Sequence, residues 1–81
     1  MTWQDYERMV SGKLVSFGLL DGHYVMERLI QSSLAFDFYK ITKEEFDSYE
    51  DWWMDEEKIM EIRLRAPWYR GFYGHQEFRE M

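Results

Sequence analysis

The chain changes character at Thr42, and this change constrains the fold more than any other feature of the sequence. Residues 34–41, LAFDFYKI, place large apolar side chains at alternate positions, which is typical of a β-strand. Thr42 and Glu45 then have the spacing of a capping box, in which each side chain accepts a hydrogen bond from the other residue's backbone N–H group. Because this motif marks the first turn of a helix, we expect a helix over about 43–54 directly after the strand.

A second turn signal, Asp21-Gly22, lies between two runs that suit β-strands. Asp-Gly favours a two-residue hairpin turn. Pairing across this turn would place two pairs of residues opposite each other: Leu19 with Tyr24, and Phe17 with Met26. The second run also fits a helix, because MERLIQ consists largely of good helix formers and Asp21 could cap its start. We favour the hairpin, with its first strand over 13–20, and leave open whether 21–33 is a hairpin arm or a helix.

Three further segments complete the pattern. Aromatic and apolar residues at helical spacing predict a short helix over 2–10. Residues 58–66, KIMEIRLRA, alternate apolar and charged side chains and therefore favour a strand that ends before Pro67. Residues 67–78 contain one proline, two glycines and five aromatic residues, which suits either a strand-like arm with turns or an ordered loop.

Together these segments predict a single α+β domain over residues 1–81. Its expected parts are a small antiparallel sheet of three or four strands, one main acidic helix (about 43–54) packed on it, and a short N-terminal helix. The aromatic fraction of 20% and the hydrophobic fraction of 46% argue for a folded chain despite the 32% of charged residues.

Several classes of function are disfavoured by what the sequence lacks. The chain has no cysteine, which excludes disulfides and thiolate chemistry and suits a cytoplasmic protein. No run approaches the ~18 apolar residues of a membrane span. The two histidines, His23 and His75, lack a metal-binding spacing, and no serine has the glycines of a nucleophile elbow around it. We therefore expect no metal, cofactor or membrane association, and we predict that the protein is not an enzyme.

Acidic side chains are concentrated in one stretch. Residues 44–57, EEFDSYEDWWMDEE, contain eight of the 16 Asp and Glu residues and no basic residue. The formal net charge is −6, and without these eight carboxylates it would be +2. The acidity is therefore local, and a local field steers binding partners while doing little to select a fold.

In the predicted helix, Phe46, Tyr49 and Trp53 would share the face that packs on the sheet, and a row of carboxylates would face away from it. Like charges four residues apart cost about 0.2 to 0.5 kcal/mol per pair, so helix stability does not explain the row. Trp52 lies between the two faces, and we expect it to be partly exposed as an anchor for a partner. The predicted partner-binding residues are Glu44, Asp47, Asp51, Trp52, Asp55, Glu56 and Glu57.

These features favour a non-enzymatic protein whose acidic, aromatic-anchored helix docks on a basic partner. One carboxylate per ~6 Å of helix could take the place of phosphates, so we expect a basic host protein such as a nuclease or another nucleic-acid-binding protein. In kind, the chain is similar to the small acidic inhibitors that phages and mobile elements make against host defence nucleases, and to nuclease immunity proteins. The opposing interpretation is a solvated helix face whose acids pair loosely with Arg63 and Arg65 on a neighbouring strand.

Two other hypotheses come from different classes. The aromatic residues could mediate self-association, as in a homodimer or an assembly subunit. The C-terminal part interleaves cations and rings, as single-stranded nucleic-acid-binding proteins do, but a net charge of −6 opposes that function, and the leading hypothesis expects no direct contact with nucleic acid. The residues of this third hypothesis are Arg63, Arg65, Trp68, Tyr69, Arg70, Phe72 and Tyr73.

Overall fold

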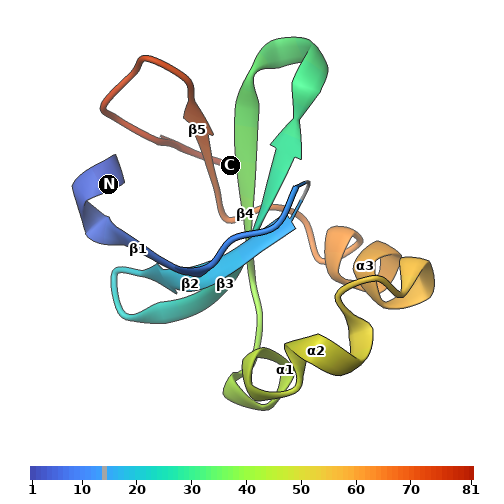
Figure 1. Ribbon diagram of the computed structural model, residues 1–81. Helices are drawn as coiled ribbons and strands as arrows, with labels where there is room; N and C mark the ends of the chain where they lie inside the picture. Colours follow the sequence, from blue (N-terminus) through green and yellow to red (C-terminus); the bar gives the residue numbers. More distant parts are fainter. Residues whose placement is uncertain (14) are drawn as a thin grey trace.

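The computed structural model describes residues 1–13 and 15–81, which form one antiparallel sheet of six strands in sequential order with three short α-helices between the fourth and fifth strands (Figure 1). The strands are β1 (Tyr6–Val10), β2 (Val15–Leu20), β3 (His23–Ile30), β4 (Ala35–Lys40), β5 (Tyr69–Phe72) and β6 (Arg79–Glu80). The helices are α1 (Lys43–Asp47), α2 (Tyr49–Trp52) and α3 (Glu56–Arg63), and single 3-10 turns lie at Trp3–Asp5 and Gln31–Ser33. The longest helix has eight residues, and no helix of the described chain is long and apolar enough to cross a membrane.

The predicted class, with three or four strands and one main helix, is therefore wrong. Six strands make the molecule mostly sheet, and the helical part is divided into short pieces. Part of the difference lies at the N-terminal end, where a helix was expected over 2–10. The Thr2–Asp5 capping box does form, but it supports only one 3-10 turn. Helix formation stops there because Tyr6–Val10 pairs with β2 as an antiparallel strand.

The helix expected over 43–54 begins as predicted but does not continue as one rod. The capping box between Thr42 and Glu45 is present at the start of α1. At Ser48 the backbone leaves the helical region, with φ −105° and ψ 16°, and α2 follows as a separate helix. The Ser48 hydroxyl donates a 2.8 Å hydrogen bond to the carbonyl oxygen of Glu44, a local bond of the kind that bends helices.

The strand expected over 58–66 is wrong, because these residues lie largely in α3. Asp55 is the N-cap of this helix, and its carboxylate accepts hydrogen bonds from the backbone N–H groups of Glu57 and Lys58 at 2.9 and 3.4 Å. Among the alternating apolar residues only Ile62 is buried, whereas Met60 and Leu64 are 48% and 80% exposed. The alternation therefore does not reflect a buried strand face.

The hairpin at Asp21-Gly22 is confirmed, and the alternative helix over 21–33 is excluded. Leu19 pairs with Tyr24 and Phe17 with Met26, as the turn signal predicted. Asp21 and Gly22 have positive φ values of 50° and 78°, as a two-residue hairpin turn requires. The first strand begins at Val15, and Leu14 of the predicted strand lies outside the described residues. The strand predicted over 34–41 is also confirmed, as β4.

The sheet is buried on both faces, which explains why several strands carry apolar residues at consecutive positions. On one face, Phe17, Met26 and Tyr39 pack against Trp52 and Ile62 of the helices, and we call this cluster the helix-side core. The second core lies apart from the helices. Its buried residues are Leu20, Val25, Phe38 and Phe78, with Trp3, Tyr6, Phe36, Trp68 and Tyr69 packed against them.

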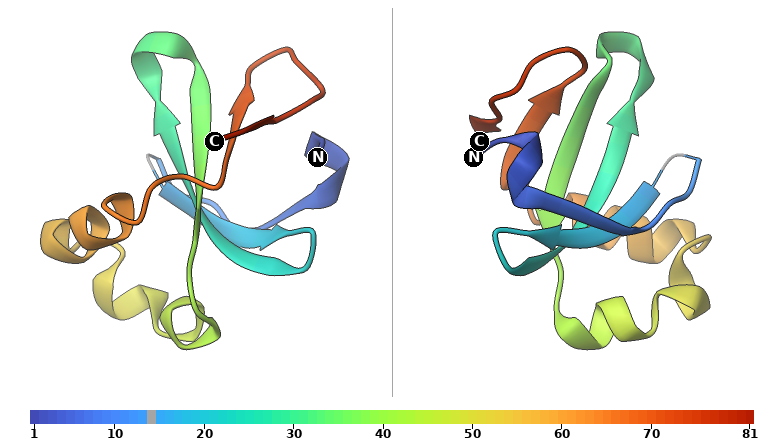
Figure 2. Two further views of the ribbon diagram at one scale, coloured as in Figure 1. Left: turned by 180° about the vertical axis from the view of Figure 1, so that it is seen from behind. Right: turned by 60° about the vertical axis from the view of Figure 1, so that its left-hand side comes forward.

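The two ends of the chain lie side by side and cover the second core (Figure 2). Thr2 forms an antiparallel bridge with Glu77, the Phe78 N–H group donates to the Met1 carbonyl oxygen at 2.8 Å, and the Trp3 N–H group donates to that of Gln76 at 3.2 Å. Of the two alternatives for residues 67–78, the strand-like arm with turns is the one observed.

Candidate binding surface and groove

The carboxylates predicted to form one row are distributed over three helices. Glu44 and Asp47 belong to α1, Asp51 to α2, and Glu56 and Glu57 to the first turn of α3. All of these side chains are exposed. Because the chain bends at Ser48 and again between α2 and α3, the expected straight row along one helix does not exist (Figure 1).

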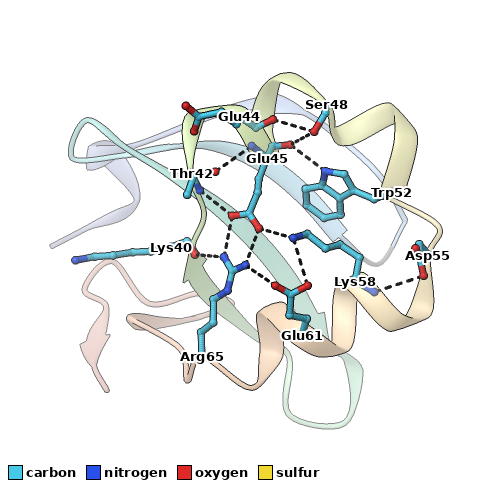
Figure 3. Close-up of polar contacts among 10 residues, drawn as sticks. All are labelled: Lys40, Thr42, Glu44, Glu45, Ser48, Trp52, Asp55, Lys58, Glu61 and Arg65. Carbon is cyan, nitrogen blue, oxygen red and sulfur yellow. Dashed lines mark hydrogen bonds and ion pairs between the residues drawn. The ribbon is translucent and has the colours of Figure 1, made fainter.

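Within the acidic stretch 44–57, Glu45 is the residue whose carboxylate joins α1 to residues beyond it in the chain. Its carboxylate accepts two hydrogen bonds from Arg65, at 2.6 and 2.8 Å, and lies 2.7 Å from the Lys58 Nζ atom (Figure 3). The hydrogen bonds from Arg65 lower the pKa of the Glu45 carboxyl well below its usual range, and Lys58 and the Thr42 N–H group add to this effect against the opposing effect of burial. The network ties the start of α1 to α3, and it also engages Glu61.

The two neighbouring tryptophans exchange the positions expected from the sequence. Trp52, predicted to be partly exposed, is only 7% exposed and packs edge-on against Phe17 at a centroid distance of 5.3 Å. Its Nε1–H group donates a 3.0 Å hydrogen bond to the Glu45 carbonyl oxygen (Figure 3). Trp53, predicted to be buried, is 42% exposed. The break at Ser48 changes the helix phase, so Trp52 points into the helix-side core and cannot serve as a surface anchor.

The connection from α2 to α3 presents apolar and acidic side chains together. Trp53 is accompanied by Met54, which is 75% exposed, and by the half-exposed Met60. Four exposed carboxylates flank these residues, and none of them forms an ion pair with a cation of the described chain. We call this set the acidic-apolar surface, and its residues are Glu50, Asp51, Trp53, Met54, Glu56, Glu57 and Met60.

Two carboxylates of the predicted set are engaged locally. Asp47 forms an exposed ion pair with Lys43 at 2.6 Å, and Asp55 caps α3. An exposed pair of this type contributes about 0 to 1 kcal/mol, so Asp47 can exchange Lys43 for another cation at little cost. Asp55 cannot do so without loss of the helix cap.

A groove of about 1070 Å³ runs between the sheet and the helices on the side of the acidic-apolar surface. Val15 and Phe17 of β2 form part of one wall, and Tyr49 of α2 with Ile59 and Met60 of α3 form part of the other. The size is typical of a small-molecule site or of a recess for a partner's side chains. No motif in the sequence indicated this groove, because its walls come from segments that are distant along the chain.

Two arginines, Arg28 of β3 and Arg63 of α3, also line the groove. Asp37 is directly opposite Arg28 across the β3–β4 pair. Asp37 is buried, and both of its oxygens accept hydrogen bonds from Arg70, at 2.6 and 3.0 Å. Neither Arg28 nor Arg63 forms an ion pair within the described chain, so both add positive charge to the lining of the groove.

The Tyr39 hydroxyl is close enough to Asp37, Arg28 and Arg63 for their charges to shift its pKa. Burial, and next the charge of Asp37, raise the pKa of the Tyr39 hydroxyl, while the charges of Arg28 and Arg63 lower it. Both guanidinium groups therefore lie near the same hydroxyl, although they come from a strand and from a helix.

A second polar network, which the sequence did not indicate, lies elsewhere on the sheet. Glu27 is 3% exposed, and its carboxylate accepts hydrogen bonds from the Tyr6 hydroxyl at 2.6 Å and from Arg8 at 2.6 and 2.9 Å. Burial, with the adjacent Glu27 charge, raises the pKa of the Tyr6 hydroxyl far above its usual range. Every group in this network has a partner within it, so we interpret the network as part of the structural framework and not as a binding site.

The cations and rings of the nucleic-acid-binding hypothesis are not gathered on one surface. Arg65 pairs with Glu45, Arg70 pairs with Asp37, and Trp68 and Tyr69 pack against the second core. Tyr73 is 74% exposed in the turn after β5. The remaining residues of that set, Arg63 and Phe72, lie on different elements, in α3 and β5.

Within residues 1–13 and 15–81, no group of three or more His, Asp or Glu side chains has an arrangement that could hold a metal ion. Comparisons with protein-family models, with curated proteins and with solved structures find no match to this chain. Function therefore has to be inferred from the acidic-apolar surface and the groove themselves.

Proposed function

We propose that this is a non-enzymatic binding protein that docks its acidic-apolar surface on a basic surface of another protein. The observation that carries the proposal is the exposure of Trp53 and Met54 between carboxylates that form no ion pair with any residue the structure describes. Large apolar side chains exposed together mark interaction sites on soluble chains, and tryptophan is enriched among residues that dominate binding energy.

The charges around this surface favour one sign of partner. Glu50, Asp51, Glu56 and Glu57 lie within eight residues of sequence that contain no Lys or Arg. Carboxylates of this kind speed association with a cationic surface and disfavour anionic ones. A partner that presents Lys and Arg around an apolar recess would match both components of the surface.

The proposal keeps the sequence-based hypothesis but changes its residues. Trp53 takes the role of anchor from Trp52, which is buried. Glu44, Asp47 and Asp51 remain candidates for steering, and Asp55 acts by holding α3 in place. The proposed partner is still a basic host protein that itself binds nucleic acid, as a nuclease does, and that the acidic surface would inhibit by occupying the site of the phosphates. Because the straight row does not form, the support for this partner is the sign of the charges and not a phosphate-like spacing.

The test is capture of partner proteins with the wild-type chain and with matched charge variants. The surface variant is Glu50→Lys, Glu56→Lys, Glu57→Lys. The control variant, Glu7→Lys, Glu77→Lys, Glu80→Lys, changes the net charge equally at exposed positions outside the surface. We expect a basic protein to be retained by the wild type and the control and lost with the surface variant and with Trp53→Ala.

Two further measurements complete the test with the captured partner. Purified partner should release bound nucleic acid when the wild-type chain is added, and the surface variant should have at least tenfold lower potency. Sedimentation over a concentration series examines self-association through the same residues. Equal retention of the partner by all variants, or formation of a stable homodimer through Trp53, would contradict the proposal.

A further inference from the structure

The groove shares Glu50, Trp53, Met54, Glu56 and Met60 with the acidic-apolar surface, but it also contains cations that docking on a basic protein does not explain. Its walls are mainly apolar side chains, including Val15, Phe17, Tyr49 and Ile59, yet three cations also line it: the exposed Lys13 and the half-buried Arg28 and Arg63. The two half-buried arginines would repel a basic partner. They indicate an occupant with an anionic group and an apolar body.

The balance of charge near the two arginines is positive. Arg70 satisfies both oxygens of Asp37, the only acidic residue of β4. Arg28 is therefore left without an ion-pair partner although it lies directly opposite Asp37, and Arg63 at the end of α3 is also unpaired in the part of the chain that is described. Both side chains are half-buried, so their charges are less screened than at an open surface.

We propose that this groove binds a single-chain aliphatic carboxylate, with the chain along the apolar walls and the head group at Arg28 and Arg63. A guanidinium group matches a carboxylate in a bidentate geometry, as Arg70 and Asp37 show within this molecule. Glu50 and Glu56 also line the groove, and they disfavour a head group with more than one negative charge, such as a phosphate monoester. The groove volume of about 1070 Å³ is sufficient for one such chain.

The experiment is calorimetric titration of the intact protein with dodecanoate, below its critical micelle concentration. We expect saturable binding of one molecule per chain, and shorter carboxylates should lose affinity by roughly fourfold per methylene group. Dodecyltrimethylammonium and dodecyl phosphate should bind at least tenfold more weakly. Equal or tighter binding of either compound would overturn the assignment of the head group.

Variants locate the site. The double variant Arg28→Gln, Arg63→Gln should lower dodecanoate affinity at least tenfold, whereas Arg79→Gln, the same change at an exposed arginine outside the groove, should leave it unchanged. Circular dichroism establishes that the double variant is folded, and a single Arg63→Gln variant, in which the sheet is untouched, gives a second measurement if it is not. Wild-type affinity in the folded variants would refute the site.

The remaining occupant is an apolar peptide that ends in a free carboxylate, and it is tested in the same titration. A short apolar peptide with a free C-terminal carboxylate that binds more tightly than dodecanoate would replace the aliphatic ligand with a polypeptide. The carboxylate site and the proposed protein docking can fail separately, because Arg28→Gln, Arg63→Gln leaves every residue of the acidic-apolar surface in place.

Discussion

Glu45 shows how one residue can serve a turn, a helix and the tertiary structure at once. As the third residue of α1 it completes the capping box with Thr42, and the same carboxylate joins Lys58 and Arg65. The capping role was predicted, because a capping box is local in sequence. The opposing interpretation expected acids of this stretch to pair with Arg65, but it could not single out Glu45, because Arg65 lies 20 residues away. Glu45 belongs to the acidic stretch 44–57, but its carboxylate connects α1 to Lys58 and Arg65 instead of facing a partner.

A pH-dependent stability follows from this position. The folded pKa of Glu45 is lowered, so its contribution is complete above the unfolded value of about 4.3 and is lost as pH falls towards the folded pKa. Glu45→Gln keeps a capping side chain but removes both ion pairs, and we expect it to lower the free energy of unfolding by about 1 to 3 kcal/mol at pH 7. Urea unfolding between about pH 7 and pH 2 should show that the variant loses less stability on acidification than the wild type.

The neighbouring Glu44 is the matched control for that measurement. Its side chain is exposed and forms no ion pair with any described residue, so Glu44→Gln should change stability by less than about 0.5 kcal/mol at every pH. Parallel acid profiles for the wild type and Glu45→Gln would show that the network does not stabilise the fold.

The adjacent tryptophans provide a second residue-scale prediction. Trp52→Phe loses the hydrogen bond to the Glu45 carbonyl oxygen and part of the contact with Phe17, so we expect it to cost about 1 to 3 kcal/mol. Trp53→Phe should cost less than about 0.5 kcal/mol, because the side chain is 42% exposed. Denaturant midpoints of the two variants test this arrangement. A larger loss of stability in Trp53→Phe than in Trp52→Phe would instead indicate a continuous helix, in which Trp53 is the buried residue.

At the scale of elements, local signals with a defined geometry were reliable, whereas periodicity predicted β4 correctly but failed for residues 2–10 and 58–66. The Asp21-Gly22 turn and the Thr42 cap each appear as predicted, since both depend on a few adjacent residues. Apolar and charged side chains alternate along residues 58–66 although this segment is not a strand. Met60 and Leu64 are exposed, so the alternation does not mark a buried face. Tyr6–Val10 has helical spacing but pairs with β2, because tertiary hydrogen bonding overrides a weak local preference.

Asp55 allows a direct test of what holds α3 in place. Asp55→Ala removes the side chain that accepts from the Glu57 and Lys58 N–H groups, and we expect a cost of about 1 kcal/mol. Hydrogen exchange should accelerate at the amides of the first turn of α3. Asp51→Ala, at an exposed carboxylate of α2 that forms no ion pair within residues 1–13 and 15–81, should leave stability within about 0.5 kcal/mol of the wild type. Similar results for the two variants would mean that the cap is not what fixes the start of α3.

At the scale of the whole molecule, the fold depends on contacts that no local pattern reveals. The second core is completed by residues from both ends of the chain, where Phe78 donates to the Met1 carbonyl oxygen. The candidate groove is likewise built from β2, β3, α2 and α3. The acidic composition of 44–57 could be read from the sequence, but its arrangement could not, because the break at Ser48 and the burial of Trp52 depend on the sheet beneath them.

Trp3 tests the contribution of the N-terminal segment to the whole fold. Its ring contacts those of Phe36, Phe38 and Phe78 at centroid distances of 5.4, 5.8 and 4.7 Å, so it joins β4 to the C-terminal segment. We expect Trp3→Ala to lower the free energy of unfolding by about 2 to 4 kcal/mol, a large part of the stability of a domain of this size. Tyr73→Ala removes an aromatic ring that is 74% exposed and should cost less than about 0.5 kcal/mol. Thermal and urea unfolding of both variants measure the difference, and equal midpoints would mean that the second core is stable without its N-terminal cover.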